Sequence, residues 1–125
     1  DIINRGGAKL ALQLYNDDGT GVGIDTESEV EVFTDGLRRV LPAGGILELD
    51  PGESVTLLPG NWHKFWGEGG DVLVGEVSTV NDDRTDNTFL DPIGRFSEID
   101  EDVDPVHLLV SDYPKWFGAG GGSGY

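Results

Sequence analysis

Residues 59–70 read PGNWHKFWGEGG, and this stretch contains one of only two histidines in the chain. His63 lies between Trp62 and Trp66, directly after the Pro59-Gly60 corner. A histidine on a strand that a tight turn anchors is held rigidly, and a neighbour can fix its second ring nitrogen, which suits a metal ligand. The alternative is an aromatic ring packed in a small β domain. The chain has no cysteine, so few side chains could share a metal with His63.

A second candidate for chemistry is Glu76, a carboxylate within the apolar run VLVGEVSTV at 72–80. Burial of this strand would raise the pKa of Glu76 toward a range that suits acid–base catalysis. The alternative is a glutamate at the rim of a barrel that is paired for structural reasons. Glu76 is therefore the first candidate for the general acid or base.

Short alternating segments punctuated by turns must position these residues. The runs KLALQLY, ILELD, ESVTLL, WHKFW and VLVGEVSTV each read as a strand, with Glu68-Gly69-Gly70 separating the last two. EVEVFTDGLRRVL at 29–41 carries Asp35-Gly36, a dipeptide that favours a tight hairpin. VHLLVSDY at 106–113 reads as a last strand. This spacing predicts an all-β sandwich or barrel.

The domain organisation expected is one domain over residues 1–117, followed by a glycine-rich flexible tail over 118–125. The polar span 81–105 is long for a loop, and such loops are usually functional or cover something. Because the sequence has no methionine, we expect it to be processed or to be a piece of a longer chain.

The charge balance restricts the partners of this chain. Twenty-four acidic residues against eight basic ones give a net charge of −16, which repels nucleic acid phosphates and anionic membranes. No apolar run approaches the ~20 residues that cross a bilayer. We therefore expect neither nucleic acid nor membrane as a partner.

Ordered motifs along the chain resemble the D-lyxose isomerase family, sugar isomerases of the cupin superfamily. Gly52, then Leu58-Pro59-Gly60 and His63 resemble the second cupin motif, although Leu58 occupies its usual proline position. The longer likeness runs through DIINRGG, LPAG, LDPGESVTLLPGNWHKFW, VLVGEVSTVNDDRTDN, IGRF and LLVSDYPK. It covers residues 1–117 and corresponds to the C-terminal part of the family.

This resemblance implies a homodimeric, cytoplasmic, jelly-roll-like cupin barrel that binds Mn²⁺ or another divalent metal. It implies interconversion of D-lyxose with D-xylulose and, in many members, of D-mannose with D-fructose. Three histidines and a glutamate hold the family's metal, and His63 matches one of them. The other three lie in a His-x-His-x4-Glu run that ends immediately before the residue matching Asp1. We therefore expect a barrel incomplete at its N-terminal side, with no cofactor unless the site is completed.

Other residues acquire roles from the chemistry of aldose–ketose isomerisation, which moves hydrogen between C1 and C2 and needs a base near the sugar. Glu76 and Asp86 are the catalytic candidates. Asp83, Arg95 and Lys64 are the candidates for binding a pentose or hexose, because carboxylates and cations pair with sugar oxygens. For the aspartates of the NDDRTDN stretch a purely local turn role is the alternative. Trp62 and Trp66 could form an apolar wall against which a sugar stacks, but large aromatics in a small barrel are more often core residues, so a core position is expected.

Two classes of function follow from these observations. The first is a metal-dependent sugar isomerase whose remaining ligands come from sequence outside this chain. The second is a non-catalytic cupin domain that serves as a structural or assembly protein, or as a carbohydrate-binding module. Because unpaired sheet edges template pairing with other chains, we expect a homodimer or a higher homo-oligomer formed through the barrel edges.

Overall fold

The computed structural model describes residues 1–80, 82, 87–91, 100 and 102–117. The chain divides into two compact units, Asp1–Ile93 and Gly94–Tyr125. The first unit holds the strands β1 (Ile2–Asp17), β2 (Ile24–Asp25), β3 (Val30–Thr34), β4 (Leu37–Leu41), β5 (Ile46–Leu49), β6 (Ser54–Thr56) and β7 (Asn61–Glu76). The prediction of an all-β class is confirmed for this unit.

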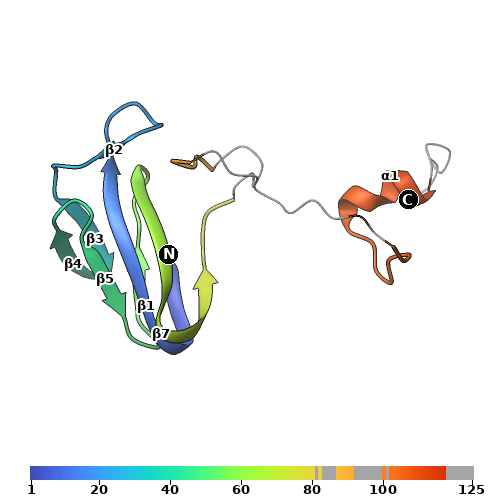
Figure 1. Cartoon of the computed structure of the whole chain (residues 1–125), viewed down its shortest axis with the longest axis horizontal. Coiled ribbons are helices and arrows are strands. Elements are labelled where there is room, and N and C mark those ends of the chain that lie inside the picture. The colour runs from blue at the N-terminus through green and yellow to red at the C-terminus, as the bar shows by residue number, and fades with distance from the viewer. Residues whose placement is uncertain (81, 83–86, 92–99, 101, 118–125) are drawn as a thin grey trace. The chain divides into compact units, whose positions relative to one another are not determined.

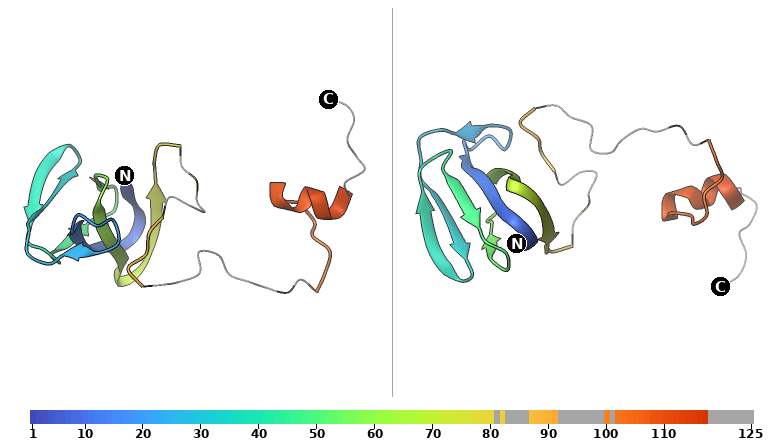
Figure 2. Two further views of the ribbon diagram at one scale, coloured as in Figure 1. Left: turned by 90° about the horizontal axis from the view of Figure 1, so that it is seen from above. Right: turned by 60° about the horizontal axis from the view of Figure 1, so that its bottom comes forward.

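Strand β1 is the centre of an antiparallel sheet. β7 pairs with it from Ile2↔Glu76 to Asn16↔Asn61, while β6, β5 and β2 pair with successive parts of β1. β6 also pairs with β3, and β3 with β4, so the β3–β4 hairpin lies on the side of β1 away from β7 (Figures 1 and 2). In the described part of the chain this sheet does not close into a barrel.

One face of the sheet forms the hydrophobic core. Alternate residues of β1 point to this face, because successive side chains of a strand alternate between its two sides. The buried cluster consists of Ile2, Leu10, Leu12, Leu14, Val30, Val32, Leu47, Leu49 and Val55. The cluster therefore contains residues of β1, β3, β5 and β6. We call the side of β1 and β7 that faces this cluster the inner face.

The long pair of β1 and β7 bends at its middle (Figure 1). Register shifts fall between Asn4 and Gly6 and between Gly7 and Lys9 of β1, which marks bulges on both sides of the bend. Gly7 has φ +99°, and a Cβ there would lie 2.2 Å from the carbonyl oxygen of Asp71. The bend therefore requires glycine at this position, both for the backbone conformation and for the close approach of β7.

The side chain of Asn4 ties this bend to the core. It is fully buried, donates to the carbonyl oxygens of Ala8 and Leu49 at 2.9 Å each, and accepts from the Gly6 amide at 3.0 Å. All three bonds lie in or beside buried backbone, where an unpaired polar group is costly. Asn4 thus joins the two arms of β1 to β5.

Several strand predictions can be compared with the structure. The hairpin at Asp35-Gly36 is confirmed, with both residues at positive φ as a tight two-residue turn needs. The separation of WHKFW from VLVGEVSTV at 68–70 is wrong, because β7 runs through both as one bulged strand that ends at Glu76. β1 pairs with β7 on both sides of the glycine-rich stretch, and the register shifts across it.

The second unit contains a short helical segment in place of the predicted last strand. Its elements are the 3-10 helix η1 (Val110–Asp112) and the helix α1 (Tyr113–Phe117), so the strand prediction for 106–113 is wrong. The rings of Tyr113 and Phe117 stack at 5.6 Å, one helical turn apart. No helix in the described residues is long and apolar enough to span a membrane.

Candidate functional site

His63 stands near the start of β7, and Asn61 fixes the turn that precedes it. The Asn61 side chain accepts from the Leu58 amide at 2.8 Å and donates to Oδ1 of Asn16 at 3.1 Å. Its backbone amide donates to the Leu58 carbonyl oxygen at 3.0 Å. The turn and the end of β1 therefore hold the first residue of β7, and His63 follows two positions later on the same side of the strand.

The imidazole of His63 lies on the inner face and is exposed. His63 pairs in register with Leu14, which is fully buried, and directly opposed side chains share a face. Its ring stacks with that of Phe65 at 6.4 Å and 9°, and Nδ1 lies 3.4 Å from the Asn61 carbonyl oxygen. This arrangement leaves Nε2 as the nitrogen available to a ligand.

Trp62 points to the opposite face and anchors the start of β7 to the end of β1. Its indole N–H donates to Oδ1 of Asp17 at 3.2 Å. This bond, together with those from the amides of Gly21 and Gly19, lowers the pKa of Asp17 below 3.8. The expectation of a core position is wrong for Trp62 and also for Trp66: both are only partly buried, and neither belongs to the core cluster.

Lys64 alternates with His63 and therefore points away from it. Lys64 pairs in register with Gln13, on the outer face of β1, and its ammonium lies 5.8 Å from the ring centroid of Trp66. This distance suits a cation–π contact. The structure thus places the predicted sugar-binding lysine and the predicted metal ligand on opposite faces of one strand.

Glu76 shares the inner face with His63, at the other end of β7. It pairs in register with Ile2, a member of the core cluster. Its side chain is nevertheless exposed, so the expected burial of Glu76 is wrong. Strand β7 ends at this residue, and the flanking Val77 is exposed as well. The catalytic role of Glu76 stays a prediction.

The remaining predicted site residues, Asp83, Asp86 and Arg95, lie outside the residues that the structure describes. Their roles in catalysis and sugar binding stay predictions.

Two open clefts meet at the start of β7. The first, of about 490 Å³, is lined by Asp17, Gly21, Gly60, Asn61, Trp62, His63, Asn87, Thr88 and Phe89. The second, of about 440 Å³, is lined by Gln13, Tyr15, Ile24, Trp62, His63, Lys64, Thr88, Phe89, Leu90 and Asp91. Both combine aromatic rings with hydrogen-bonding groups, which is the composition of small-molecule sites. The segment 87–91, which the sequence placed in a functional loop, forms one wall of each.

The described residues do not by themselves fit a metal ion. No group of three or more histidine, cysteine, aspartate or glutamate side chains converges anywhere in them. Stable divalent sites need three or four converging ligands, and His63 supplies one imidazole. A metal at His63 therefore needs donors beyond the described part of the chain.

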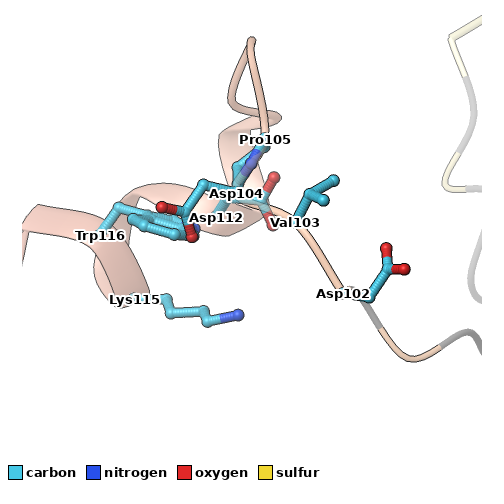
Figure 3. Close-up of a pocket in the computed structure, with 7 residues that line it drawn as sticks. All are labelled: Asp102, Val103, Asp104, Pro105, Asp112, Lys115 and Trp116. Atoms are coloured by element: carbon cyan, nitrogen blue, oxygen red, sulfur yellow. The ribbon is translucent and has the colours of Figure 1, made fainter.

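A further pocket of about 510 Å³ lies in the second unit. Its lining combines the stretch Asp102–Pro105 with Asp112, Lys115 and Trp116 at the helical segment (Figure 3). The Lys115 ammonium lies 5.4 Å from the ring centroid of Trp116. No residue singled out from the sequence as a site residue lines this pocket.

The sequence reasoning missed the residues that position the site. Asn4 holds the bend, Asn61 holds the turn before His63, and Asp17 anchors Trp62. A signal existed for Asp17, since NDDGTG marks a turn in which aspartate accepts from backbone amides. The sequence around Asn4 did not indicate its role. Its partner Ala8 lies across the bend in β1, and its partner Leu49 lies in β5, far away in the sequence.

Comparison with known proteins places these observations in a family. A family model described as D-lyxose isomerase matches residues 1–113. A D-lyxose/D-mannose isomerase of Serratia proteamaculans is 55% identical over 118 residues, which are 93% of this chain and 51% of the relative. A D-lyxose/D-mannose isomerase of Escherichia coli O157:H7 is 50% identical over the same shares. The chain spans about half the length of the curated relatives it matches.

Proposed function

The chain belongs to the D-lyxose isomerase family, and from this premise we propose that it forms part of a cupin-type aldose–ketose isomerase. The substrates proposed are D-lyxose and D-mannose, which would yield D-xylulose and D-fructose. The observation that carries the proposal is the 55% identity, over nearly the whole chain, with a D-lyxose/D-mannose isomerase. His63 and Glu76 support it, because both lie beside core residues on one face of β7.

In this proposal Glu76 moves the proton between C1 and C2 of the open-chain sugar. A carboxylate can take the proton from one carbon and return it to the other, provided that bulk water is excluded from the site. Glu76 is exposed in the structure, so the proposal requires a further part of the fold to cover it. Asp86 would assist the proton transfer.

Binding of the sugar would use residues of both faces and of the loop that follows β7. Asp83 and Arg95 would pair with sugar hydroxyl groups as acceptor and donor. Lys64 would act at the cleft that it lines together with Trp62, Tyr15 and His63.

For a divalent metal such as Mn²⁺, His63 would contribute one ligand and other parts of the assembled protein would contribute the rest. The described residues do not fit such an ion alone, so we assign no step of the reaction to it. We expect the 125-residue chain without added segments to bind Mn²⁺ weakly.

The decisive experiment measures ketose formation from D-lyxose with Mn²⁺ in two proteins. One is this chain, and the other carries in addition the part of the Serratia proteamaculans relative that this chain does not cover. We expect activity only in the second protein, and its loss in Glu76→Gln and His63→Ala variants. Leu37→Ser, an exposed change on β4, serves as the control that keeps activity. An inactive, correctly folded second protein would contradict the proposal.

A second candidate function is carbohydrate binding without catalysis, or an assembly role. The clefts at Trp62 favour the binding version, because a sugar can use aromatic and polar groups without a metal. Calorimetric titration of the chain with D-lyxose, D-mannose and D-fructose in the presence of a chelator tests it. Binding that a Trp62→Ala variant loses would support this function, and the absence of heat for all three sugars would contradict it.

A further inference from the structure

A chain of side-chain hydrogen bonds leads from the loop before β3 to the turn before His63. The amide of Asn16, near the end of β1, donates from Nδ2 to the carbonyl oxygen of Glu29 at 2.9 Å. Its Oδ1 accepts from Nδ2 of Asn61 at 3.1 Å. Oδ1 of Asn61 in turn accepts from the Leu58 amide at 2.8 Å. Asn16 and Asn61 therefore connect two loops that are far apart in the sequence.

Each of these two side-chain amides uses both its nitrogen and its oxygen, so its orientation is determined. An amide donates only from its nitrogen and accepts only at its oxygen. Turning the Asn16 amide over would set its oxygen against the Glu29 carbonyl oxygen, and turning Asn61 over would set its nitrogen against the Leu58 amide. The loop of Glu29 is held in addition by Asp25, whose carboxylate accepts from two amides of that loop at 2.8 and 3.0 Å. The arrangement of the pair is thus fixed from both loops.

The amide pair lies beside His63, and the carbonyl group of Asn61 is not used by β1. Side chains at alternate positions of a strand share a face, so Asn61 and His63 both point to the inner face. The Asp17 amide donates to the Gly60 carbonyl oxygen at 2.8 Å. Because bonded and non-bonded pairs alternate along an antiparallel ladder, Asn16↔Asn61 is a pair without backbone bonds between its members. Its side chains therefore stand close together, and the Asn61 carbonyl group points away from β1.

The Asn61 carbonyl oxygen determines which nitrogen of the neutral His63 ring carries the proton. This oxygen lies 3.4 Å from Nδ1. A carbonyl oxygen only accepts, so the contact is favourable only when Nδ1 carries the proton and Nε2 keeps its lone pair. The ring of Phe65, at an interplanar angle of 9°, stacks with the imidazole. A bond from one ring nitrogen to a backbone carbonyl group commonly fixes the tautomer and orientation of a histidine that binds a ligand through the other.

We propose that Asn16 and Asn61 are positioning residues that hold His63 in the tautomer with its proton on Nδ1. Asn61 acts through its carbonyl group, and Asn16 acts through the side chain of Asn61. The Nε2 lone pair is thereby made available before any ligand binds. This inference deepens the proposed function and rests on it for the task of His63, whereas the tautomer itself belongs to the free chain and is measured there.

Nitrogen-15 NMR of the full 125-residue chain measures the tautomer. Two-bond proton–nitrogen correlations distinguish a protonated Nδ1 from a protonated Nε2, and they are recorded well above ~6.5, the pKa of an ordinary imidazole. His107 is the other histidine of the sequence and is exposed, so it provides an internal reference, and a His107→Gln variant assigns the signals. An imidazole in water favours the proton on Nε2. We expect the ratio of Nδ1–H to Nε2–H to be about fivefold higher in His63 than in His107, the factor that one ordinary hydrogen bond supplies.

Variants of the two asparagines test their positioning role. Asn61→Ala should move the His63 signals toward those of His107, because the turn that holds the carbonyl group loses its side-chain bonds. Asn16→Ala should move them in the same direction by a smaller amount. Asn16→Asp keeps an acceptor for the Asn61 amide and should restore most of the Nδ1–H tautomer.

The matched control is Gln13→Ala. Gln13 lies on the outer face of the same strand, and its side-chain amide donates to the Gly44 carbonyl oxygen at 3.1 Å. Its removal should leave the His63 signals unchanged. Circular dichroism checks that each variant is folded, and the tautomer of the unsubstituted chain decides the case if the asparagine variants unfold.

Three results would overturn the proposal. They are a proton on Nε2 of His63 in the unsubstituted chain, unchanged signals in both alanine variants of the asparagines, and an equal change in Gln13→Ala. The proposed function is tested separately by ketose formation. An Nδ1–H tautomer in a completed protein without isomerase activity would contradict the proposed function and leave the positioning role supported, and an Nε2–H tautomer in an active protein would do the reverse.

Discussion

Strands β1 and β7 are equally long, sixteen residues each, and are paired along nearly their whole length, yet their environments differ sharply. β1 has neighbours on both sides and the β3–β4 hairpin beyond them, and its Leu10, Leu12 and Leu14 are fully buried. Among the described strands β7 has only β1 beside it, and His63 and Phe65 on the same face are exposed.

This difference shows that side-chain alternation determines the face to which a residue points, but not whether other residues cover that face. Phe65 lies opposite Leu12 and has the same access to the inner face. Leu12 also packs in the core cluster with residues of β3, β5 and β6, whereas Phe65 does not belong to that cluster. His63 and Glu76, which carry the predicted chemistry, likewise lie on β7 outside the cluster.

The largest expected effect comes from substituting this register pair. Leu12→Ala should lower the free energy of unfolding by about 3 kcal/mol, because it opens a cavity in a filled core. Phe65→Ala should lower it by no more than about 1 kcal/mol, since its ring is half-exposed already. Urea denaturation followed by circular dichroism measures both. Equal losses of stability would show that β7 is covered in solution and that Leu12 and Phe65 have similar environments.

The next effect concerns the bend that both strands share. Asn4→Ala should lower the free energy of unfolding by about 2 kcal/mol, because it leaves the carbonyl groups of Ala8 and Leu49 and the amide of Gly6 without their partner. Asn16→Ala, which removes bonds at the exposed end of β1, is the matched control and should cost about 0.5 kcal/mol. The same denaturation series compares them, and a larger loss in the control would refute the role of Asn4.

A pair of glycines tests the close approach of β7 to β1 at the bend. Gly7→Ala and Gly52→Ala introduce a Cβ at similar positive φ, +99° and +92°, but only at Gly7 does the Cβ meet another atom, the Asp71 oxygen at 2.2 Å. In both variants backbone strain should lower the free energy of unfolding by about 1 kcal/mol. Gly7→Ala should lose at least about 1 kcal/mol more as β7 shifts. Thermal unfolding of the two variants measures the difference, and identical values would mean that β7 adjusts freely.

The smallest effect concerns the anchor between Asp17 and Trp62. Because the folded-state pKa of Asp17 is lowered, its contribution to stability is present above the unfolded value near 3.8 and is lost as the pH falls through the folded value. Asp17→Asn should therefore be slightly less stable than the unsubstituted chain well above pH 3.8, and the difference should shrink as the pH falls below that value. Denaturant titrations over this range test it. Asp18→Asn controls for removing one negative charge from the same loop.

Much of the fold could be predicted from local chemistry. The Asp35-Gly36 hairpin and the strand at Lys9–Tyr15 depend on turn chemistry and alternation within a few residues, and both are present. The run VHLLVSDY failed as a strand because the composition of a short apolar run does not distinguish a strand from a helical turn. The glycines at 69–70 were predicted to separate two strands, but β7 continues through them as a bulge because it pairs with β1 on both sides.

For the candidate site the sequence supplied candidate residues, whereas their arrangement depended on the fold. His63 was singled out from the Pro59-Gly60 turn, and the turn does present it on an inward-facing position of β7. The burial of Glu76 was inferred from its apolar neighbours in sequence, but burial depends on a covering layer that sequence neighbours do not provide. The positioning roles of Asn4 and Asn61 depend on partners in other strands.

The family and the turns could be predicted from residue identity, and the β class and the face of His63 from the two-residue period of the strands. Strand pairing was needed to establish that the two halves of β7 form one strand, that Lys64 points away from His63, and that Phe65 is half-exposed beside a buried Leu12. Register and cover come from pairing between segments distant in sequence. The alternation within one strand does not specify them.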